Sequence, residues 1–311
     1  MASPSQVLVS EVGPRDGLQS IASTLTLAAK KKWIDALARS GLKEIEVGSF
    51  VSPKWVPQLA DTAEVVAHAL GIEGLKVAVL VPNLQGATAA VQAGAHKITL
   101  PFSASETHSL KNVRRTHAQM FEEVAAIAAL LHSVDGARRP RFEVGMSTAF
   151  GCTYEGVVPA DRVVALAEGA MRAGCDEVGL SDSVGYANPA QIRDLVSRVK
   201  RAIGAETFAG LHLHNTRGLG LANVIAGLEV GVTTFDASQA GLGGCPFAPG
   251  ATGNIVTEDL VFMLEAMGIT TGIDLGKLLN AREVLASVLP HEPLYGFVHA
   301  AGLPLGFDAT S

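Results

Sequence analysis

Short apolar runs alternate with longer amphipathic stretches along most of the chain. Most of the short runs are continuously apolar, which is typical of parallel strands covered on both faces. We expect strands, in chain order, at Val7–Val12, Glu44–Phe50, Leu75–Val81, His96–Phe102, Arg141–Ala149, Glu177–Ser181, Phe208–His214 and Thr233–Ala237.

The stretches between these runs predict helices, because their apolar residues recur at helical spacing. The first is expected over Leu27–Ser40, with Thr26 as its N-cap and Gly41 as a left-handed stop. Further helices are expected to begin at Asp61 or Thr62, at Asn83, at Pro159, at Pro189 and at Thr252 or Asn254, the last ending at Met267, and to cover Arg115–His132 and Leu275–Val288.

A strand followed by a helix, repeated eight times, predicts a single (β/α)₈ TIM-barrel domain. The barrel is expected to occupy about residues 7–270, with a short C-terminal helical extension at about 271–311. An open doubly wound sheet is the alternative, but it would usually carry a glycine-rich phosphate loop after its first strand. The corresponding segment here, Gly13–Gly17, is charged and lacks that spacing.

The composition narrows the class of protein. Hydrophobic residues make up 48% and charged residues 17%, so the chain can bury a large core and is not disordered. A net charge of −6 argues against a nucleic-acid partner. We expect no membrane span, since no apolar run reaches about 18 residues, and no secretory signal. Three cysteines without a C-x-x-C pair predict a reducing, cytoplasmic location.

Catalytic groups of a barrel collect at the C-terminal ends of its strands. His212 and His214 lie two residues apart on the seventh expected strand, so their imidazoles point the same way. They are either half of a metal site or ordinary core histidines. Asp16 could add a carboxylate and Asn254 an amide oxygen. Such a set suits Mg²⁺ or Mn²⁺, and its ligand types leave Zn²⁺ open.

Other strand ends carry further candidates. Arg15 is either a solvated partner of Asp16 or a fixed positive charge for an oxyanion. Cys245 lies in the glycine-rich segment 241–254, where a thiol could donate or accept a proton. Glu46 could orient a neighbouring site residue. Asp182 either serves the site or caps the next turn.

Several of these residues lie in longer motifs. Glu11–Gln19, Ser49–Gln58, Phe150–Cys152 with Tyr154–Gly156, and Gly241–Asn254 with Thr257–Leu260 resemble signatures of the 3-hydroxy-3-methylglutaryl-CoA (HMG-CoA) lyase family. The Arg-Asp and His-x-His elements are shared with a wider barrel superfamily that includes isopropylmalate and homocitrate synthases. The cysteine segment is specific to the lyase branch.

The resemblance implies a TIM barrel and metal-assisted cleavage of a 3-hydroxyacyl-CoA into acetyl-CoA and a keto acid. By matching position it implies the metal ligands Asp16, His212, His214 and Asn254. It implies that Arg15 contacts the thioester enolate, that Cys245 is the acid or base, and that Glu46, Asp182 and Glu258 support them. His212 is either the base that accepts the hydroxyl proton or a metal ligand, or both. We also expect an acyl-CoA as partner and a homo-oligomer, a dimer or tetramer.

Three positions depart from the family pattern. The family usually has Asp where this chain has Asn215, an aromatic residue where it has Arg217, and Asn-Glu-Lys where it has Ser20–Ala22. The substrate is therefore either HMG-CoA or a related acyl-CoA, such as citramalyl-CoA or a longer 3-substituted glutaryl-CoA. Rival functions are a Claisen-condensing synthase, a metal-dependent hydrolase and a non-catalytic binding module.

Overall fold

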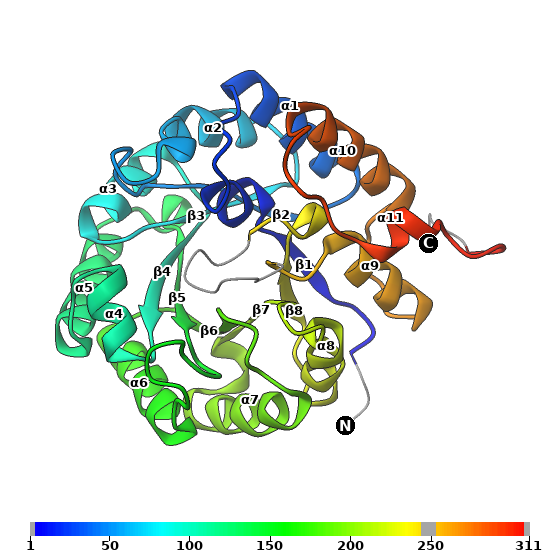
Figure 1. The fold of residues 1–311 in the computed structure, drawn as a ribbon. Helices are drawn as coiled ribbons and strands as arrows, with labels where there is room; N and C mark the ends of the chain where they lie inside the picture. The colour runs from blue at the N-terminus through cyan, green and yellow to red at the C-terminus, as the bar shows by residue number, and fades with distance from the viewer. Residues whose placement is uncertain (1–3, 244–252, 308–311) are drawn as a thin grey trace.

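The computed structural model describes residues 4–243 and 253–307. Eight parallel strands close into a barrel in which each strand pairs with the next and β1 pairs with β8 (Figure 1). The strands are β1 Leu8–Glu11, β2 Glu44–Ser49, β3 Lys76–Leu80, β4 Lys97–Ser103, β5 Arg141–Ser147, β6 Glu177–Asp182, β7 Phe208–Leu213 and β8 Thr234–Ala237. The predicted TIM barrel is confirmed, and every predicted strand is present.

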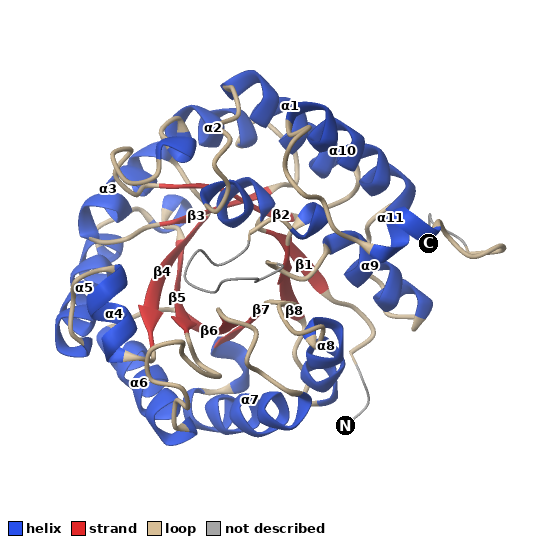
Figure 2. Cartoon of the chain, viewed as in Figure 1, coloured by secondary structure: helices blue, strands red, loops and turns tan. Residues whose placement is uncertain are grey.

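Helices form a ring outside the strands (Figure 2). They are α1 Leu27–Arg39, α2 Thr62–Ala69, α3 Leu84–Ala93, α4 Glu106–Asn112, α5 His117–His132, α6 Ala160–Ala173, α7 Pro189–Ile203, α8 Gly220–Glu229, α9 Thr257–Ala266, α10 Leu275–Val288 and α11 Phe297–Ala301. Helix α10, in the C-terminal extension, packs against α1 and α9 (Figure 1). No helix in the described part of the chain is long and apolar enough to cross a membrane.

Two predicted helix starts are wrong. Helix α9 begins at Thr257 rather than at Thr252 or Asn254, and Thr252 lies outside the described residues. Asn254 instead forms an antiparallel bridge with His214, and Val256 forms a parallel bridge with strand-end residue Ser238. This pairing keeps the segment extended until α9 begins.

The helix predicted from Arg115 begins at His117. Thr116 caps it in a reciprocal capping box with Gln119, so the two residues before the helix adopt non-helical backbone. The short helices α4 and α11 and the helix α8 were not predicted.

The interior of the barrel is unusually polar for this fold, whose inward positions are typically filled by Val, Ile and Leu. Lys97 is buried there, and its Nζ lies 2.6 Å from Glu143 Oε2, 3.4 Å from Glu44 Oε1 and 3.5 Å from Glu177 Oε1. Burial lowers the pKa of Lys97, but the three carboxylates outweigh burial and raise it well above its ordinary value. Lys97 is therefore the cation that these three carboxylates share.

Small side chains accompany these charges. Ser10, Ala78, Gly145 and Gly179 line a cavity of about 880 Å³ that also reaches the residues at the C-terminal ends of the strands. A Cβ at position 179 would lie 2.5 Å from Glu143 Oε1, so this position accepts only glycine while Glu143 keeps its place beside Lys97.

Replacing Lys97 tests how much the polar interior depends on it. Lys97→Met keeps most of the side-chain volume but leaves Glu44, Glu143 and Glu177 without their shared cation. We expect the free energy of unfolding to fall by about 3–5 kcal/mol, because Glu143 then loses its cation partner. Within the described residues, Glu44 and Glu177 keep only Lys76 and Arg141 as cation partners. Urea unfolding measures this change.

Lys76 provides the matched control. Its Nζ lies 3.3 Å from Glu44 Oε2, but its side chain is 53% exposed. Lys76→Met should cost less than about 1 kcal/mol, as expected for a solvent-screened ion pair. Equal losses in the two variants would contradict the assigned role of Lys97.

Candidate active site

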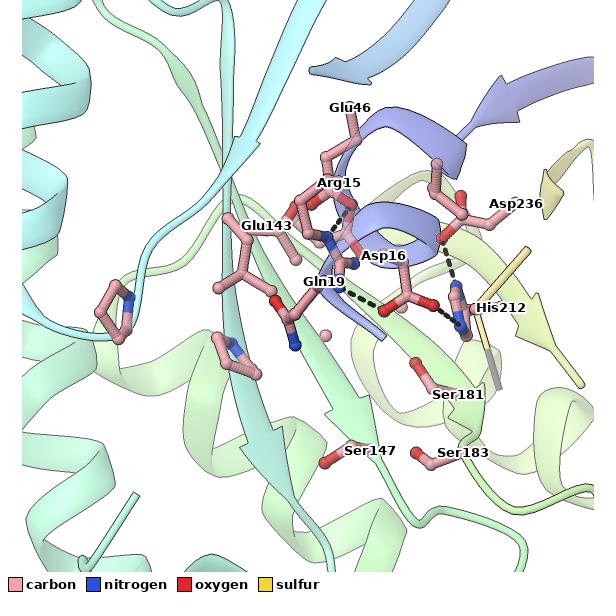
Figure 3. A pocket seen from close by; sticks show the side chains of 18 of the residues that line it. Arg15, Asp16, Gln19, Glu46, Glu143, Ser147, Ser181, Ser183, His212 and Asp236 are labelled. Atoms are coloured by element: carbon pink, nitrogen blue, oxygen red, sulfur yellow. Dashed lines mark hydrogen bonds and ion pairs between the residues drawn. The ribbon is translucent and has the colours of Figure 1, made fainter. Parts of the chain in front are cut away.

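The loop after β1 carries Arg15 and Asp16 over the mouth of the barrel (Figure 3). Residues Gly13–Gly17 form a π-helical turn in which the Val12 carbonyl accepts hydrogen bonds from the backbone N–H groups of Arg15 and Asp16, at 3.1 and 2.7 Å. Pro14 suits the first positions of such a turn, because its missing N–H is not needed there. The turn places both side chains in the cavity.

Arg15 is held by two carboxylates. Its Nε donates to Glu46 Oε2 and its Nη1 to Asp16 Oδ1, each at 2.5 Å. Burial lowers the pKa of Arg15, but Glu46 and Asp16 outweigh it, so the guanidinium stays charged. Burial raises the pKa of Asp16, while Arg15 and the nearby histidines lower it, to a net value of about 2. Asp16 is therefore a carboxylate at neutral pH.

The two histidines of β7 and its end point into the same space. His212 Nε2 lies 3.1 Å from His214 Nε2 and 4.0 Å from Asp16 Oδ2. One ligand atom from each of these three residues lies within 4.8 Å of the others, which is a possible metal site. Burial and the neighbouring His212 lower the pKa of His214 to about 3, so this imidazole is neutral and can offer a lone pair.

Asn254 joins this group through backbone pairing. Asn215 N donates to Gly253 O at 2.9 Å and Ile255 N to Leu213 O at 3.1 Å, so residues 253–255 lie beside the end of β7. The Asn254 amide Nδ2 then donates to Asp16 Oδ2 at 2.7 Å and to Leu242 O at 3.1 Å. Its Oδ1 is buried and has no hydrogen-bond partner among the described residues.

Gly243 makes this approach possible. Its φ is +112°, and a Cβ at this position would lie 2.4 Å from Asn254 Nδ2 and 3.0 Å from Asp16 Oδ2. Both the backbone conformation and the space therefore require glycine. Gly243 is therefore a glycine because its backbone packs directly against Asn254 and Asp16.

These observations fit a divalent cation. The site offers one carboxylate, two imidazoles and an amide oxygen that no other group occupies. Oxygen and imidazole ligands of this kind suit Mg²⁺ or Mn²⁺ and do not exclude Zn²⁺.

Other predicted residues lie around this group rather than in it. Asp182 accepts hydrogen bonds from Tyr186 N and Ala187 N, so it organises the loop after β6, and burial raises its pKa to about 6. The Asn215 side chain accepts from Gly220 N at the start of α8. Cys245 lies outside the described residues.

Glu258 is fully buried at the start of α9, away from the cavity-lining residues. It accepts hydrogen bonds from Ala240 N and from Arg282 Nη1, at 3.1 and 3.0 Å. It therefore connects the loop after β8 to helix α10 in the C-terminal extension.

Asp236 was not predicted as a site residue, but its Oδ2 lies 3.1 Å from His212 Nδ1 (Figure 3). Gln19 and Ser147, which line the cavity, were not predicted either (Figure 3). The one sequence signal for Asp236 was a carboxylate within an otherwise uncharged expected strand, Thr233–Ala237. Its position beside His212 depends on strand pairing, which places His212 opposite Asp236.

A closed (β/α)₈ barrel with these groups at its mouth is the architecture of a TIM-barrel enzyme with a possible metal site. Residues 6–285 match the model of the HMGL-like family, and the chain belongs to this family.

Similar proteins agree with this assignment. The chain is 42% identical to the mitochondrial hydroxymethylglutaryl-CoA lyase of Macaca fascicularis over 92% of its length and 86% of that protein. It is 40% identical to the Bacillus subtilis hydroxymethylglutaryl-CoA lyase, over 96% and 99% of the two chains. An Acinetobacter baumannii HMG-CoA lyase, solved with coenzyme A and 3-methylmalate, superposes with a TM-score of 0.90 at 42% identity and 99% coverage of both chains.

Glu11 connects the two loops that frame the site. Its Oε1 accepts from Gly13 N at 2.8 Å and Gln239 N at 2.9 Å, and its Oε2 accepts from Thr257 Oγ1 at 2.7 Å. Burial raises its pKa to about 8, although hydrogen bonds from Thr257 and from the backbone lower it. A pKa of about 8 predicts that the folded protein keeps Glu11 protonated at neutral pH, with Oε2 sharing its proton with the Thr257 hydroxyl.

This raised pKa predicts a pH-dependent stability. In the unfolded chain a glutamate has a pKa of about 4.3. Between this pH and about pH 8, the folded protein holds a proton that the unfolded chain has released. The wild type loses stability as the pH rises through this window, whereas Glu11→Gln does not. We expect the free energy of unfolding of the variant, relative to wild type, to rise by about 2–4 kcal/mol from pH 5 to pH 8.

Urea unfolding at several pH values measures this difference. Glu64→Gln, at an exposed position of α2, is the control and should show a difference that does not change with pH. A pH-independent difference for Glu11→Gln as well would show that Glu11 is ionised in the folded protein.

Proposed function

We propose that this protein is a metal-dependent carbon–carbon lyase that cleaves HMG-CoA into acetyl-CoA and acetoacetate. The observation that carries the proposal is the convergence of Arg15, Asp16, His212, His214 and Asn254 at the mouth of a barrel of the HMGL-like family. The names of its relatives support the same reaction.

Asp16, His212, His214 and Asn254 would hold the cation, with Mg²⁺ or Mn²⁺ as the proposed ion. When bound, such an ion polarises the hydroxyl and carboxylate oxygens of the substrate. Asp16 contributes the negative charge of the site, and Arg15 and Asn254 keep its carboxylate aimed at the histidines. Water can fill the remaining positions around an ion of this type.

Arg15 is placed to stabilise the charge that develops during cleavage. As the carbon–carbon bond breaks, the hydroxyl-bearing carbon becomes a carbonyl and the acetyl-CoA fragment leaves as an enolate. The Arg15 guanidinium lines the cavity and cannot lose its proton, so it offers a permanent positive charge to that enolate. Glu46 holds it in one orientation through Nε.

The reaction also needs a base for the hydroxyl proton and an acid for the enolate carbon. We assign the acid to Cys245, and His212 is either the base, a ligand of the cation, or both. The two roles of His212 make different demands on Asp236, the carboxylate beside its Nδ1.

Basic side chains at the rim of the cavity would meet an acyl-CoA. Lys111, Arg114 and Arg115 all line it, in and after helix α4. Arg115 pairs with Glu123, whereas Arg114 makes no ion pair within residues 4–243 and 253–307. An anionic CoA tail could therefore find local positive charge on a protein whose net charge is −6.

Of the three departures from the family pattern, Ser20 lines the cavity, whereas Asn215 and Arg217 do not. Arg217 donates to the Val184 and Gly185 carbonyls and lies 4.5 Å from the centre of the Tyr186 ring, so it braces the loop after β6 rather than entering the cavity. The 3-methylmalate bound to the Acinetobacter baumannii relative is a branched hydroxy-dicarboxylate that is shorter than the HMG group. The citramalyl group is also a branched hydroxy-dicarboxylate of this shorter length, so citramalyl-CoA is the second candidate substrate.

Two further properties are proposed with the function. We propose a cytoplasmic location, which suits the free and buried thiols of Cys152 and Cys175. We also propose a homo-oligomer, a dimer or tetramer.

The function is tested by following acetyl-CoA release with Mg²⁺ or Mn²⁺. The panel contains HMG-CoA, citramalyl-CoA and a longer 3-substituted glutaryl-CoA, and a parallel assay offers acetyl-CoA with 2-oxo acids. We expect cleavage with the highest kcat/KM for HMG-CoA and loss of activity with a chelator. No cleavage of any member would reject the lyase assignment, and thiol release in the parallel assay would favour a condensing synthase.

Arg15 is tested by substitution. We expect Arg15→Gln to lower kcat by roughly 10²–10³ with a smaller change in KM, because the guanidinium acts mainly on charge formed in the transition state. Arg15→Lys should recover only part of the rate, since an ammonium cannot bind Glu46 and Asp16 as a fork.

Steady-state kinetics with HMG-CoA measures both variants. Arg139→Gln is the control. The Arg139 guanidinium donates to both carboxylate oxygens of Asp176, but it lies just before β5, at the end of the barrel opposite the site. A kcat for Arg15→Gln within a few-fold of wild type would remove the role given to this residue.

A further inference from the structure

Asp236 lies on the inner wall of the barrel, on β8 and next to β7. Strand pairing places it opposite His212, and its Oδ2 lies 3.1 Å from His212 Nδ1 (Figure 3). Among the described residues this is the one hydrogen bond that the Asp236 carboxylate makes. The Asp236 side chain is 32% exposed and lines the cavity, so this hydrogen bond is the contact that fixes its carboxylate.

The contact determines which nitrogen of His212 carries the proton. A carboxylate oxygen only accepts hydrogen bonds, so Nδ1 must be the donor and must be protonated. In the neutral ring the lone pair then lies on Nε2. That atom faces the space shared by His214 Nε2, at 3.1 Å, and Asp16 Oδ2, at 4.0 Å.

The two histidines are held in different ways. The His214 Nδ1 is buried and has no hydrogen-bond partner among the described residues. The position of His214 comes instead from its backbone, which forms a bridge with Asn254. His212 lies within β7 next to an open cavity, and its side chain needs a partner to fix the ring.

We propose that Asp236 is a positioning residue that holds His212 as a cation ligand through Nε2. Carboxylate partners of this kind fix the tautomer and the ring orientation of a ligating histidine and strengthen its binding. This inference rests on the proposed metal site, and it assigns His212 primarily to binding the cation rather than to accepting the hydroxyl proton.

The two roles of His212 predict different consequences when Asp236 is replaced. If His212 is a ligand, loss of Asp236 weakens cation binding, and a saturating cation concentration restores much of kcat. If His212 is only the base, cation affinity stays the same and kcat falls at every cation concentration. The Mn²⁺ dissociation constant, measured without substrate, separates them.

The experiment titrates the full-length protein with Mn²⁺ and follows the free ion by electron paramagnetic resonance. We expect Asp236→Ala to raise the Mn²⁺ dissociation constant by roughly 10–100-fold, as found for other partners of metal-bound histidines. Asp236→Asn keeps the shape and one oxygen acceptor, so it should raise the constant by less. This graded order is not expected from a general loss of folding.

Glu143→Gln is the matched control. Glu143 is another carboxylate in the barrel interior and lines the same cavity, but its partner is Lys97 rather than His212. The Mn²⁺ dissociation constant of Glu143→Gln should stay within about three-fold of wild type, which is a much smaller change than that expected for Asp236→Ala. Circular dichroism of each variant confirms that the comparison is made on folded protein.

An unchanged Mn²⁺ dissociation constant in folded Asp236→Ala would overturn the inference, as would equal losses of Mn²⁺ affinity in Asp236→Ala and Glu143→Gln. A wild type that does not bind Mn²⁺ would also overturn it. Because binding is measured without substrate, a wild type that binds Mn²⁺ in an Asp236-dependent way but cleaves no acyl-CoA would reject only the proposed lyase function.

Discussion

Charges inside a closed barrel must be neutralised by other charges within reach, because bulk water cannot solvate them. This constraint organises the protein from the barrel interior to the mouth. In the interior, Lys97 is surrounded by three glutamates. At the mouth, Arg15 is shared between Glu46 and Asp16. These ion pairs offset the cost of burying the charges, and they also fix the positions of the side chains. A catalytic site requires such fixed positions.

The pairs connect elements that are far apart in the chain. The contact of Arg15 with Glu46 ties the loop after β1 to β2, and the contact of Asp16 with Asn254 ties that loop to the segment before α9. Glu11 and Glu258 extend the connection to the loop after β8 and to Arg282 of the C-terminal extension. The extension is thus bonded to the loops that frame the site, although it contributes no cavity-lining residue of its own among those described.

Position within the cavity separates the residues that can touch a substrate from those that support them. Arg15, Asp16, His212 and His214 line it. Asp182 and Asn215 instead receive backbone N–H groups of neighbouring loops, which is the capping role that short polar side chains commonly take. Residue type alone could not make this distinction, because an aspartate that caps a loop and one that binds a cation look the same in a sequence.

The sequence by itself determined the alternation of strands and helices, and hence the barrel, because hydrophobic periodicity is a local property of the chain. It also determined that Arg15, Asp16 and the His212–His214 pair lie at strand ends. Only the tertiary structure decided that Asp236 faces His212, that Gly243 must be a glycine, and that Lys97 contacts three glutamates. Those relations depend on strand register and on loops that return from distant positions, and no local pattern encodes the distance between two side chains on different strands.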